Sequence, residues 1–197
     1  MYDGEALYLS GVVRDPSPMM NRQDPEVKGD KGWDADACQF RIILDPAQPY
    51  PPTASQWEHQ GNNPTPDTRN DIVHLTLWNF TDRDQACLGL QVGMSYRMLR
   101  PEWAPFGIVQ ADLYQGKYVK ADDGRGYTFE YRIPWSTLGA QKPLKGGDVV
   151  AGTFQFNWGQ ADGLRTAGGA AWCYDLLREP GFPYQSSTVW GKVIFSD

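Results

Sequence analysis

The sequence has few of the residues and motifs on which metal binding, catalysis or membrane insertion usually depend. Among its 197 residues there are only two histidines, His59 and His74, and they are not spaced as HxxxH or HxH zinc ligands. It contains no GxSxG, no phosphate-binding loop and no GxGxxG before a helix. No apolar run approaches the roughly 20 residues that a membrane-spanning helix needs. We therefore expect neither a membrane span nor an enzyme.

Basic side chains are also fewer than acidic ones. The 18 Lys and Arg against 24 Asp and Glu leave a formal net charge of −6, and no stretch is rich in Lys or Arg. Nucleic-acid-binding domains carry basic patches, so nucleic acid is excluded as an expected partner. An acidic surface suits neutral ligands and cations better than polyanions.

Cysteine is scarce, with three residues in no recognisable metal or redox spacing. The odd number leaves at least one free thiol. Cys38 and Cys87 both lie in apolar, strand-like segments, which predicts buried structural thiols.

Aromatic and turn-forming residues are abundant instead. Aromatics make up 13% of the chain, and there are 21 Gly and 15 Pro residues. This combination favours an all-β fold over a helical bundle. We found no internal repeat and no linker, so residues 1–197 are expected to form one domain. Because strand-like sequence begins only five residues into the chain, we expect a leader, and a first strand or neighbouring domain, to precede it.

Alternating apolar and polar residues predict about nine short strands with little helix, as in a two-sheet antiparallel β-sandwich of jelly-roll or immunoglobulin-like type. Two of the strands are expected to pair as a local hairpin around Tyr114. The expected strands are residues 6–13, 38–44, 71–79, 88–93, 107–113, 117–121, 127–133, 149–157 and 189–195.

The most informative stretch is GYTFEYRIPWSTLG, residues 126–139. Its aromatic residues alternate with polar ones, which predicts a strand with one face in the core. Pro134 cannot donate a ladder hydrogen bond, so we expect the strand to end there in a short corner. The stretch is typical of a core strand, and ligands are expected elsewhere.

The order of these segments resembles carbohydrate-binding module family 9 and its broader DOMON-like superfamily. The resemblance covers nearly the whole chain and lacks only the family's N-terminal strand. It rests on the order of six segments, which are EALYLSGVVRDP, GWDADACQFRIILD, YTFEYRIPW, AGTFQFNWG, AAWCYD and VWGKVIF.

The resemblance implies that a sugar at a chain end is clamped between two aromatic side chains while polar groups read its hydroxyls. Trp33 matches the family's first clamp aromatic, and Gln39 stands where the family has an acidic hydrogen-bonding residue. Asn157 falls near the position of a side-chain amide in a later strand of the family. The second clamp is expected before the last strand. That segment has no Trp and offers Phe182 or Tyr184 instead.

A sugar site needs a flat aromatic for the CH face and planar hydrogen-bonding groups for the hydroxyl edge. Trp33, Gln39, Arg41, His74 and Asn157 would provide this set if their strands adjoin. Gln39 and Arg41 share a strand face by the period of two. Each residue also has an alternative role that the same sequence would fit. Gln39 and Arg41 could belong to an ordinary solvated sheet face, His74 could be structural, and Trp33 could close the end of the sandwich.

Five of the other tryptophans have three different expected roles. Trp78 and Trp135 belong to apolar segments and are expected in the core. Trp158 and Trp172 could line the rim of the site. Trp57 lies in a long polar loop, where it would be either a stacking platform or a pin that holds the loop.

Two ligands other than sugar are suggested by the loop RDPSPMMNRQDPE. Asp15 and Asp24 offer oxygens for a structural Ca²⁺, although the spacing is not that of an EF-hand and Asp-Pro turns would explain the same residues. Met19 or Met20, paired with His59 or His74, would suit a b-type haem, because the superfamily includes haem-binding electron-transfer domains.

The sequence thus predicts a noncatalytic carbohydrate-binding domain of an extracellular or periplasmic protein. Its partners would be a polysaccharide or oligosaccharide and an attached catalytic domain, which it would target to its substrate. The alternatives are the haem-binding electron-transfer domain and a purely structural or docking sandwich.

Overall fold

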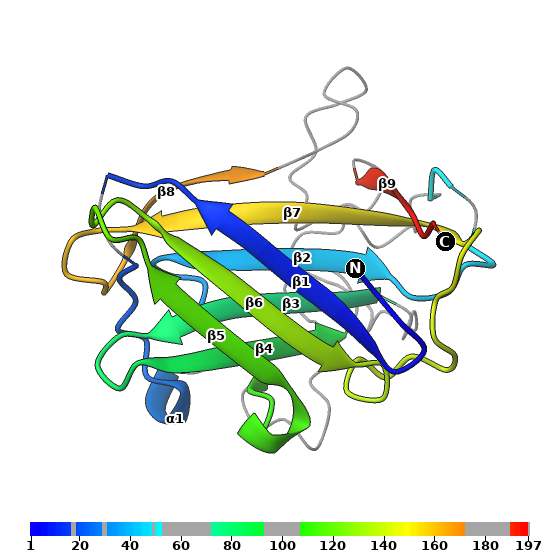
Figure 1. The fold of residues 1–197 in the computed structure, drawn as a ribbon, viewed down its shortest axis with the longest axis horizontal. Helices are drawn as coiled ribbons and strands as arrows, with labels where there is room; N and C mark the ends of the chain where they lie inside the picture. The colour runs from blue at the N-terminus through cyan, green and yellow to red at the C-terminus, as the bar shows by residue number, and fades with distance from the viewer. Residues whose placement is uncertain are drawn as a thin grey trace, which may run out of the picture.

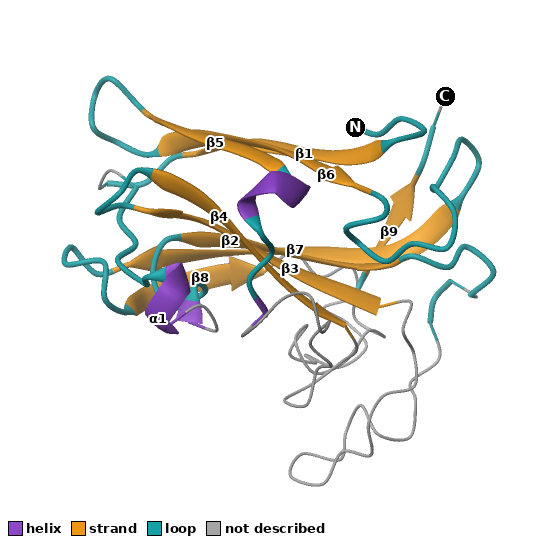
Figure 2. Cartoon of the chain, turned by 90° about the horizontal axis from the view of Figure 1, so that it is seen from below, coloured by secondary structure: helices purple, strands orange, loops and turns teal. Residues whose placement is uncertain are grey.

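A computed structural model describes residues 1–16, 19–28, 31–48, 50–52, 72–92, 107–171 and 190–196. These residues form nine strands in two antiparallel sheets of three and six strands, with very little helix. Figure 2 shows the two sheets as stacked layers. The predicted all-β, two-sheet sandwich is confirmed.

The smaller sheet has the order β1-β6-β5, and the larger has the order β4-β3-β2-β7-β8, with β9 also pairing with β7 (Figure 1). Their bounds are β1 Ala6–Val13, β2 Ala37–Ile43, β3 Ile72–Phe80, β4 Gln85–Val92, β5 Gln115–Lys120, β6 Tyr127–Pro134, β7 Val149–Gly159, β8 Thr166–Ala171 and β9 Gly191–Ile194. Two short helices, α1 (Pro25–Lys28) and the 3-10 helix η4 (Ala111–Leu113), accompany the sheets.

The alternation predicted for residues 127–133 is present in β6. Tyr127, Phe129, Tyr131 and Ile133 are buried, whereas the residues between them are half-buried or exposed. Pro134 is the last residue of the strand, and residues 135–139 turn away from it, with the positive φ of 72° at Gly139. The strand therefore lies in the core of the sandwich, as the sequence indicates.

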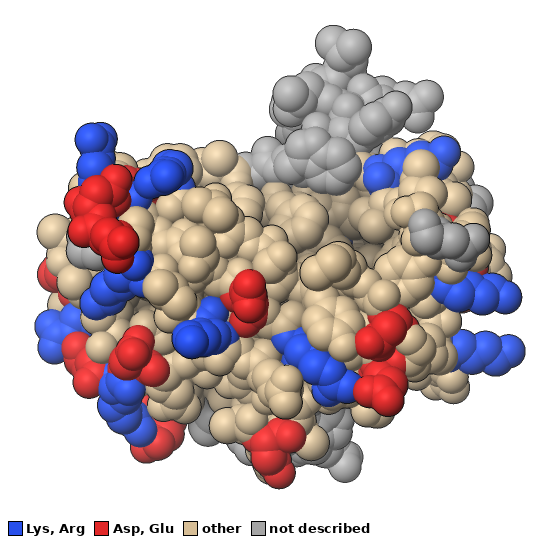
Figure 3. All heavy atoms as spheres, in the orientation of Figure 1, with Lys and Arg blue, Asp and Glu red and all other residues tan. Residues whose placement is uncertain are grey.

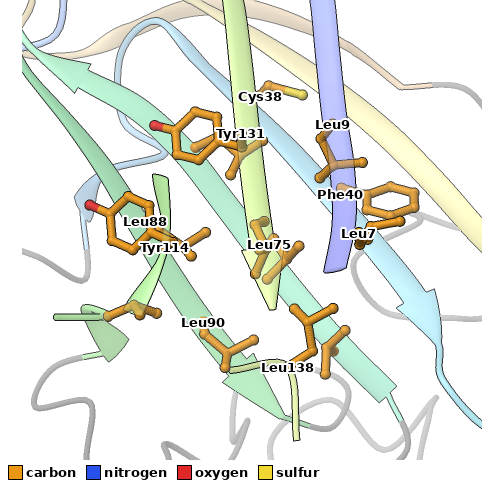
Figure 4. Packing of buried hydrophobic residues seen from close by; sticks show 14 of the residues in the cluster. Leu7, Leu9, Cys38, Phe40, Leu75, Leu88, Leu90, Tyr114, Tyr131 and Leu138 are labelled. Atoms are coloured by element: carbon orange, nitrogen blue, oxygen red, sulfur yellow. The ribbon is translucent and has the colours of Figure 1, made fainter. Parts of the chain in front are cut away.

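The core lies between the two sheets (Figure 4). Leu7 and Leu9 of β1 and the aromatic rings of β6 face the apolar side of the larger sheet. The hydroxyl of Tyr131 donates to the backbone carbonyl oxygen of Cys87 in β4, at 2.8 Å, and so joins one sheet to the other. The core also contains Cys38, Trp78, Cys87 and Trp135, as predicted.

The predicted hairpin around Tyr114 is wrong. Residues 107–113 contain only an isolated bridge from Ile108 to Gly89 and the helix η4. β5 pairs along its whole length with β6. The reason is the core: this pairing buries Tyr118, whose ring lies 6.0 Å from that of Phe129 between centroids.

Besides η4, the strand β8 and the helix α1 were not predicted. The strand β8 has the sequence TAGGAA, which carries no strand-forming alternation, and it is formed by pairing with β7. The short helix α1 lies in what the sequence indicates as a loop. Asp24 begins this helix by accepting a hydrogen bond from the backbone N–H of Glu26 at 2.9 Å.

The surface shows no region of a single charge sign on the face seen in Figure 3, where Lys and Arg side chains lie among Asp and Glu side chains. In the smaller sheet, cross-strand partners such as Lys117 and Glu130 place opposite charges side by side. Within the described part of the chain, no helix is long and apolar enough to cross a membrane.

Candidate functional site

A row of polar side chains lies on the face of the larger sheet that points away from the smaller sheet. The neighbours of these residues along each strand, such as Phe40 in β2 and Leu75 in β3, point into the core. The strand register sets Gln39 beside Thr76, and Arg41 beside His74. The row consists of Gln39, Arg41, His74, Thr76, Gln155 and Asn157.

Arg41 determines the orientation of the amides on either side of it. A guanidinium can only donate hydrogen bonds, so its partners must present oxygen. Nη2 of Arg41 donates to Oε1 of Gln39 at 3.2 Å, and Nη1 donates to Oε1 of Gln155 at 3.3 Å. The amide nitrogens of both glutamines therefore point away from Arg41, in opposite directions along the row.

On one side, this orientation determines the state of His74. Nε2 of Gln39 lies 2.9 Å from Nε2 of His74 and 3.3 Å from Oγ1 of Thr76. Because the amide donates, Nε2 of His74 accepts, which requires a neutral ring with its proton on Nδ1. Burial, and then the charge of Arg41, lower the pKa of His74 well below its usual value, in agreement with that neutral state.

On the other side, the hydrogen bonds reach the loop that carries Trp33. Nε2 of Gln155 donates to Oδ1 of Asn157 at 3.0 Å, and Nδ2 of Asn157 donates to the backbone carbonyl oxygen of Trp33 at 2.9 Å. Oγ1 of Thr166 donates to the same carbonyl at 3.2 Å. The chain of donors thus runs from Arg41 to the backbone of Trp33.

Trp33 is the exposed aromatic at the end of this row. Its side chain is 40% exposed, whereas Gln39, Arg41, His74 and Asn157 are buried. The ammonium of Lys31 lies 5.3 Å from the centre of a ring of Trp33. The arrangement places the backbone of a partly exposed tryptophan at the end of a line of oriented hydrogen-bonding groups.

Two carboxylates hold the loop of Trp33 against β7 and β8. Asp34 accepts a hydrogen bond from the backbone N–H of Thr166 at 2.9 Å. Asp36, which is 1% exposed, accepts from the backbone N–H groups of Met20 and Gly159, at 2.6 and 2.5 Å. Burial raises the pKa of Asp36 to about 6, against the opposing effect of these two hydrogen bonds.

Five of the residues predicted from the sequence therefore meet in a single hydrogen-bonded network, namely Trp33, Gln39, Arg41, His74 and Asn157. Phe182 and Tyr184, predicted as the second aromatic clamp, lie outside the described residues. Gln155 and Thr76 were not predicted. Both follow from the period of two, since Gln155 shares a face with Asn157, and Thr76 shares a face with His74.

Asp24, one of the two predicted calcium ligands, is paired with Arg83. Both carboxylate oxygens of Asp24 accept hydrogen bonds from Nη2 of Arg83, at 2.8 and 2.9 Å. No group of three or more His, Cys, Asp or Glu that could hold a metal ion occurs in the described ranges. The Ca²⁺ site at Asp15 and Asp24 stays a prediction.

The residues named for haem have other surroundings in the described part of the chain. Met19 is fully buried in the main core cluster, and Met20 is half-buried. His74 shares its Nε2 with Gln39, and His59 lies outside the described residues. No observation here favours the haem alternative, which stays a prediction.

No family model matches this chain, and no curated protein matches it. Solved structures with a similar fold include carbohydrate-binding modules. A family 9 carbohydrate-binding module from Caldicellulosiruptor kristjanssonii in complex with cellotriose has a TM-score of 0.57 and 15% identity, over 100% of this chain and 72% of that one. The same module in complex with glucose gives 0.57 and 15%, over 100% and 73%. A proposed carbohydrate-binding protein from Bacteroides uniformis ATCC 8492 gives 0.54 and 12%, over 98% and 74%.

At these identities the comparisons establish the fold. The chain is similar in structure to family 9 carbohydrate-binding modules along its whole length, as its sequence predicted.

Proposed function

We propose that the protein binds carbohydrate without breaking a bond, with the indole of Trp33 stacked on a sugar ring at the end of the polar row. The observation that supports this most directly is the series of hydrogen bonds from Arg41 to the carbonyl oxygen of Trp33. Through buried and half-buried side chains of the sheet it holds the backbone of a residue with an exposed aromatic ring, which is more than a solvated sheet face requires.

The physical advantage of such a site is preorganisation. A sugar has to be met by an aromatic surface and by donors and acceptors that are already oriented, because ordering them during binding would cost free energy. Here the orientation of each amide follows from that of Arg41. Gln155 is half-buried, so it is the member of the row, together with Thr76, that is best exposed for contact with hydroxyls.

Cellotriose and glucose in the similar structures suggest gluco-oligosaccharides as the first ligands to test. As part of the same proposal, the domain would act outside the cytoplasm and hold an attached enzyme on polysaccharide. Phe182 and Tyr184 remain the proposed second aromatic clamp.

The test is binding of the purified chain to a panel of immobilised polysaccharides and to soluble oligosaccharides, measured by retention and calorimetry. We expect Trp33→Ala to weaken binding at least tenfold, equivalent to about 1.4 kcal/mol, with an unchanged circular dichroism spectrum. Ile194→Ala is the matched control, because Ile194 is 60% exposed and pairs with Val149 at the opposite end of β7. Binding that survives Trp33→Ala unchanged would place the site elsewhere, and a blank panel would reject the function.

A further inference from the structure

Two exposed tryptophans lie at the same end of β7. Trp158 directly follows Asn157, whose side chain bonds the carbonyl of Trp33. Trp158 is 42% exposed, close to the 40% of Trp33. Strand alternation puts Trp158 on the face of Phe154 and Phe156, opposite to Asn157. Trp158 therefore lies on one face of this corner of the larger sheet, and the loop of Trp33 is bonded to the other face.

The ring of Trp158 lies against Gly168, its partner in β8. A Cβ placed on Gly168 would lie 2.6, 2.8 and 2.9 Å from Nε1, Cε2 and Cζ2 of the ring. These three atoms form one edge of the indole, so the edge that carries Nε1 lies against Gly168. The glycine thus leaves room for this edge of the ring, while Trp158 as a whole stays 42% exposed.

The strand β8 lies between the two tryptophan positions and forms a rim that has no bulky side chains. It is the last strand of the described sheet on this side, and Ala167, Gly169 and Ala170 are exposed. Gly169 lies beside Asn157, where a Cβ would come within 2.8 Å of Oδ1. The two consecutive glycines therefore leave room for Trp158 on one face and for Asn157 on the other.

A single exposed apolar side chain is common and needs no explanation. Trp158 differs because it adjoins the proposed site, and because the edge of its indole packs against Gly168 at the border of the sheet while the residue stays 42% exposed. Those two features point to a ligand with flat apolar faces that passes over the rim.

We propose that Trp158 is a second sugar-stacking platform, and that the site takes a linear oligosaccharide that runs from Trp33 across β8 to Trp158. This inference rests on the proposed function and narrows its ligand to chains of several sugar units. One unit contacts the polar row and Trp33, and a later unit along the chain stacks on Trp158.

The test is calorimetry with glucose, cellobiose, cellotriose, cellotetraose and cellohexaose. For the wild type we expect affinity to rise at least tenfold from glucose to cellohexaose. Trp158→Ala is expected to remove most of that rise and to leave the affinity for glucose unchanged. Trp33→Ala should weaken every ligand of the series. Trp158→Phe keeps an aromatic face and should retain part of the gain, and Ile194→Ala should retain all of it.

A second variant shifts the indole of Trp158 without removing it. Gly168→Ala displaces the indole of Trp158, so it should also reduce the gain with chain length, whereas Gly4→Ala, where a Cβ meets nothing within 4 Å, should not. A wild type whose affinity does not rise with length, or a Trp158→Ala variant that keeps the full rise, overturns the inference alone. A wild type that binds no glycan in the series or the panel overturns the proposed function as well.

Discussion

Asn157 donates a hydrogen bond from Nδ2 to the backbone carbonyl oxygen of Trp33 across 2.9 Å. This bond connects the polar row of the larger sheet to the loop that carries the exposed indole. The direction of the bond is imposed by Arg41, because Gln155 already donates to Oδ1 of Asn157 and leaves only the amide nitrogen for Trp33. The loop conformation therefore depends on a residue three hydrogen bonds away from it in the network.

Replacing Asn157 by Asp tests this dependence with almost no change of shape. An aspartate keeps the acceptor for Gln155 but turns a carboxylate oxygen towards the carbonyl of Trp33, so one hydrogen bond becomes a repulsion. We expect a loss of about 1–3 kcal/mol in the free energy of unfolding, measured by urea denaturation.

Glycan affinity should fall in the same variant, because the Trp33 loop is no longer held. Asn157→Ala removes both bonds and serves as the comparison. If Asn157→Asp were as stable as the wild type and bound glycan equally well, the proposed link between the network and Trp33 would be wrong.

The neutral state of His74 leads to a second prediction. An unfolded histidine titrates near 6.5, whereas the pKa of folded His74 lies well below its usual value. Below pH 6.5 the unfolded state therefore binds more protons than the folded state. The contribution of neutral His74 to the free energy of unfolding is fully present above pH 6.5. It is lost as the pH falls, by up to about 1.4 kcal/mol per pH unit for one group.

The measurement is the free energy of unfolding of the wild type and of His74→Gln between pH 8 and pH 4.5. The variant cannot titrate at this position. As the pH falls, the free energy of unfolding of the wild type should therefore decrease relative to that of the variant. A difference that is independent of pH would show that His74 takes up its proton in the folded protein as readily as in the unfolded one.

Much of the fold could be predicted from the sequence because the strands that build the core alternate. The β6 segment is the clearest case, since Tyr127, Phe129 and Tyr131 all point inward. The strand β8 could not be predicted in this way. Its residues are small, and what makes it a strand is the register with β7 rather than any pattern of its own.

The site could be predicted in part for the same reason. The period of two places Gln39 and Arg41 on one face, and the family resemblance adds Trp33 and Asn157. The bonds between them depend on strand order, which brings β7 and β3 to opposite sides of β2. Trp158 was predicted at the rim, but its contact with Gly168 was not, because a glycine in a sequence does not reveal which ring lies against it.

A third prediction concerns the connection between the sheets. Tyr131→Phe removes the hydroxyl that donates to the carbonyl of Cys87 at 2.8 Å in a buried position. The carbonyl then loses a partner without access to water, which should cost about 1–2 kcal/mol of unfolding free energy. Tyr2→Phe is the control, because the bond from Tyr2 to the carbonyl of Ser196 is exposed and its loss should cost less than about 0.5 kcal/mol. Equal effects of the two variants would contradict the role of Tyr131.

The last prediction concerns Asp36, whose pH dependence is opposite in sign to that of His74. Burial raises the pKa of Asp36 from 3.8 to about 6. Between these two values the folded protein holds a proton that the unfolded chain has already released. The stability associated with Asp36 is therefore present at low pH and is lost as the pH rises from about 4 to about 6, and it stays lost above that.

A shift of roughly two pKa units corresponds to about 3 kcal/mol. We expect the unfolding free energy of Asp36→Asn, relative to the wild type, to rise by about 2–3 kcal/mol between pH 4 and pH 7. The wild type alone would not reveal this, because His74 acts in the opposite direction over part of the same range. The carboxyl carbon resonance of Asp36 provides the direct check, with an expected midpoint of about 6 that is absent from the variant. A midpoint at or below 3.8 would mean that the hydrogen bonds from Met20 and Gly159 outweigh the cost of burial.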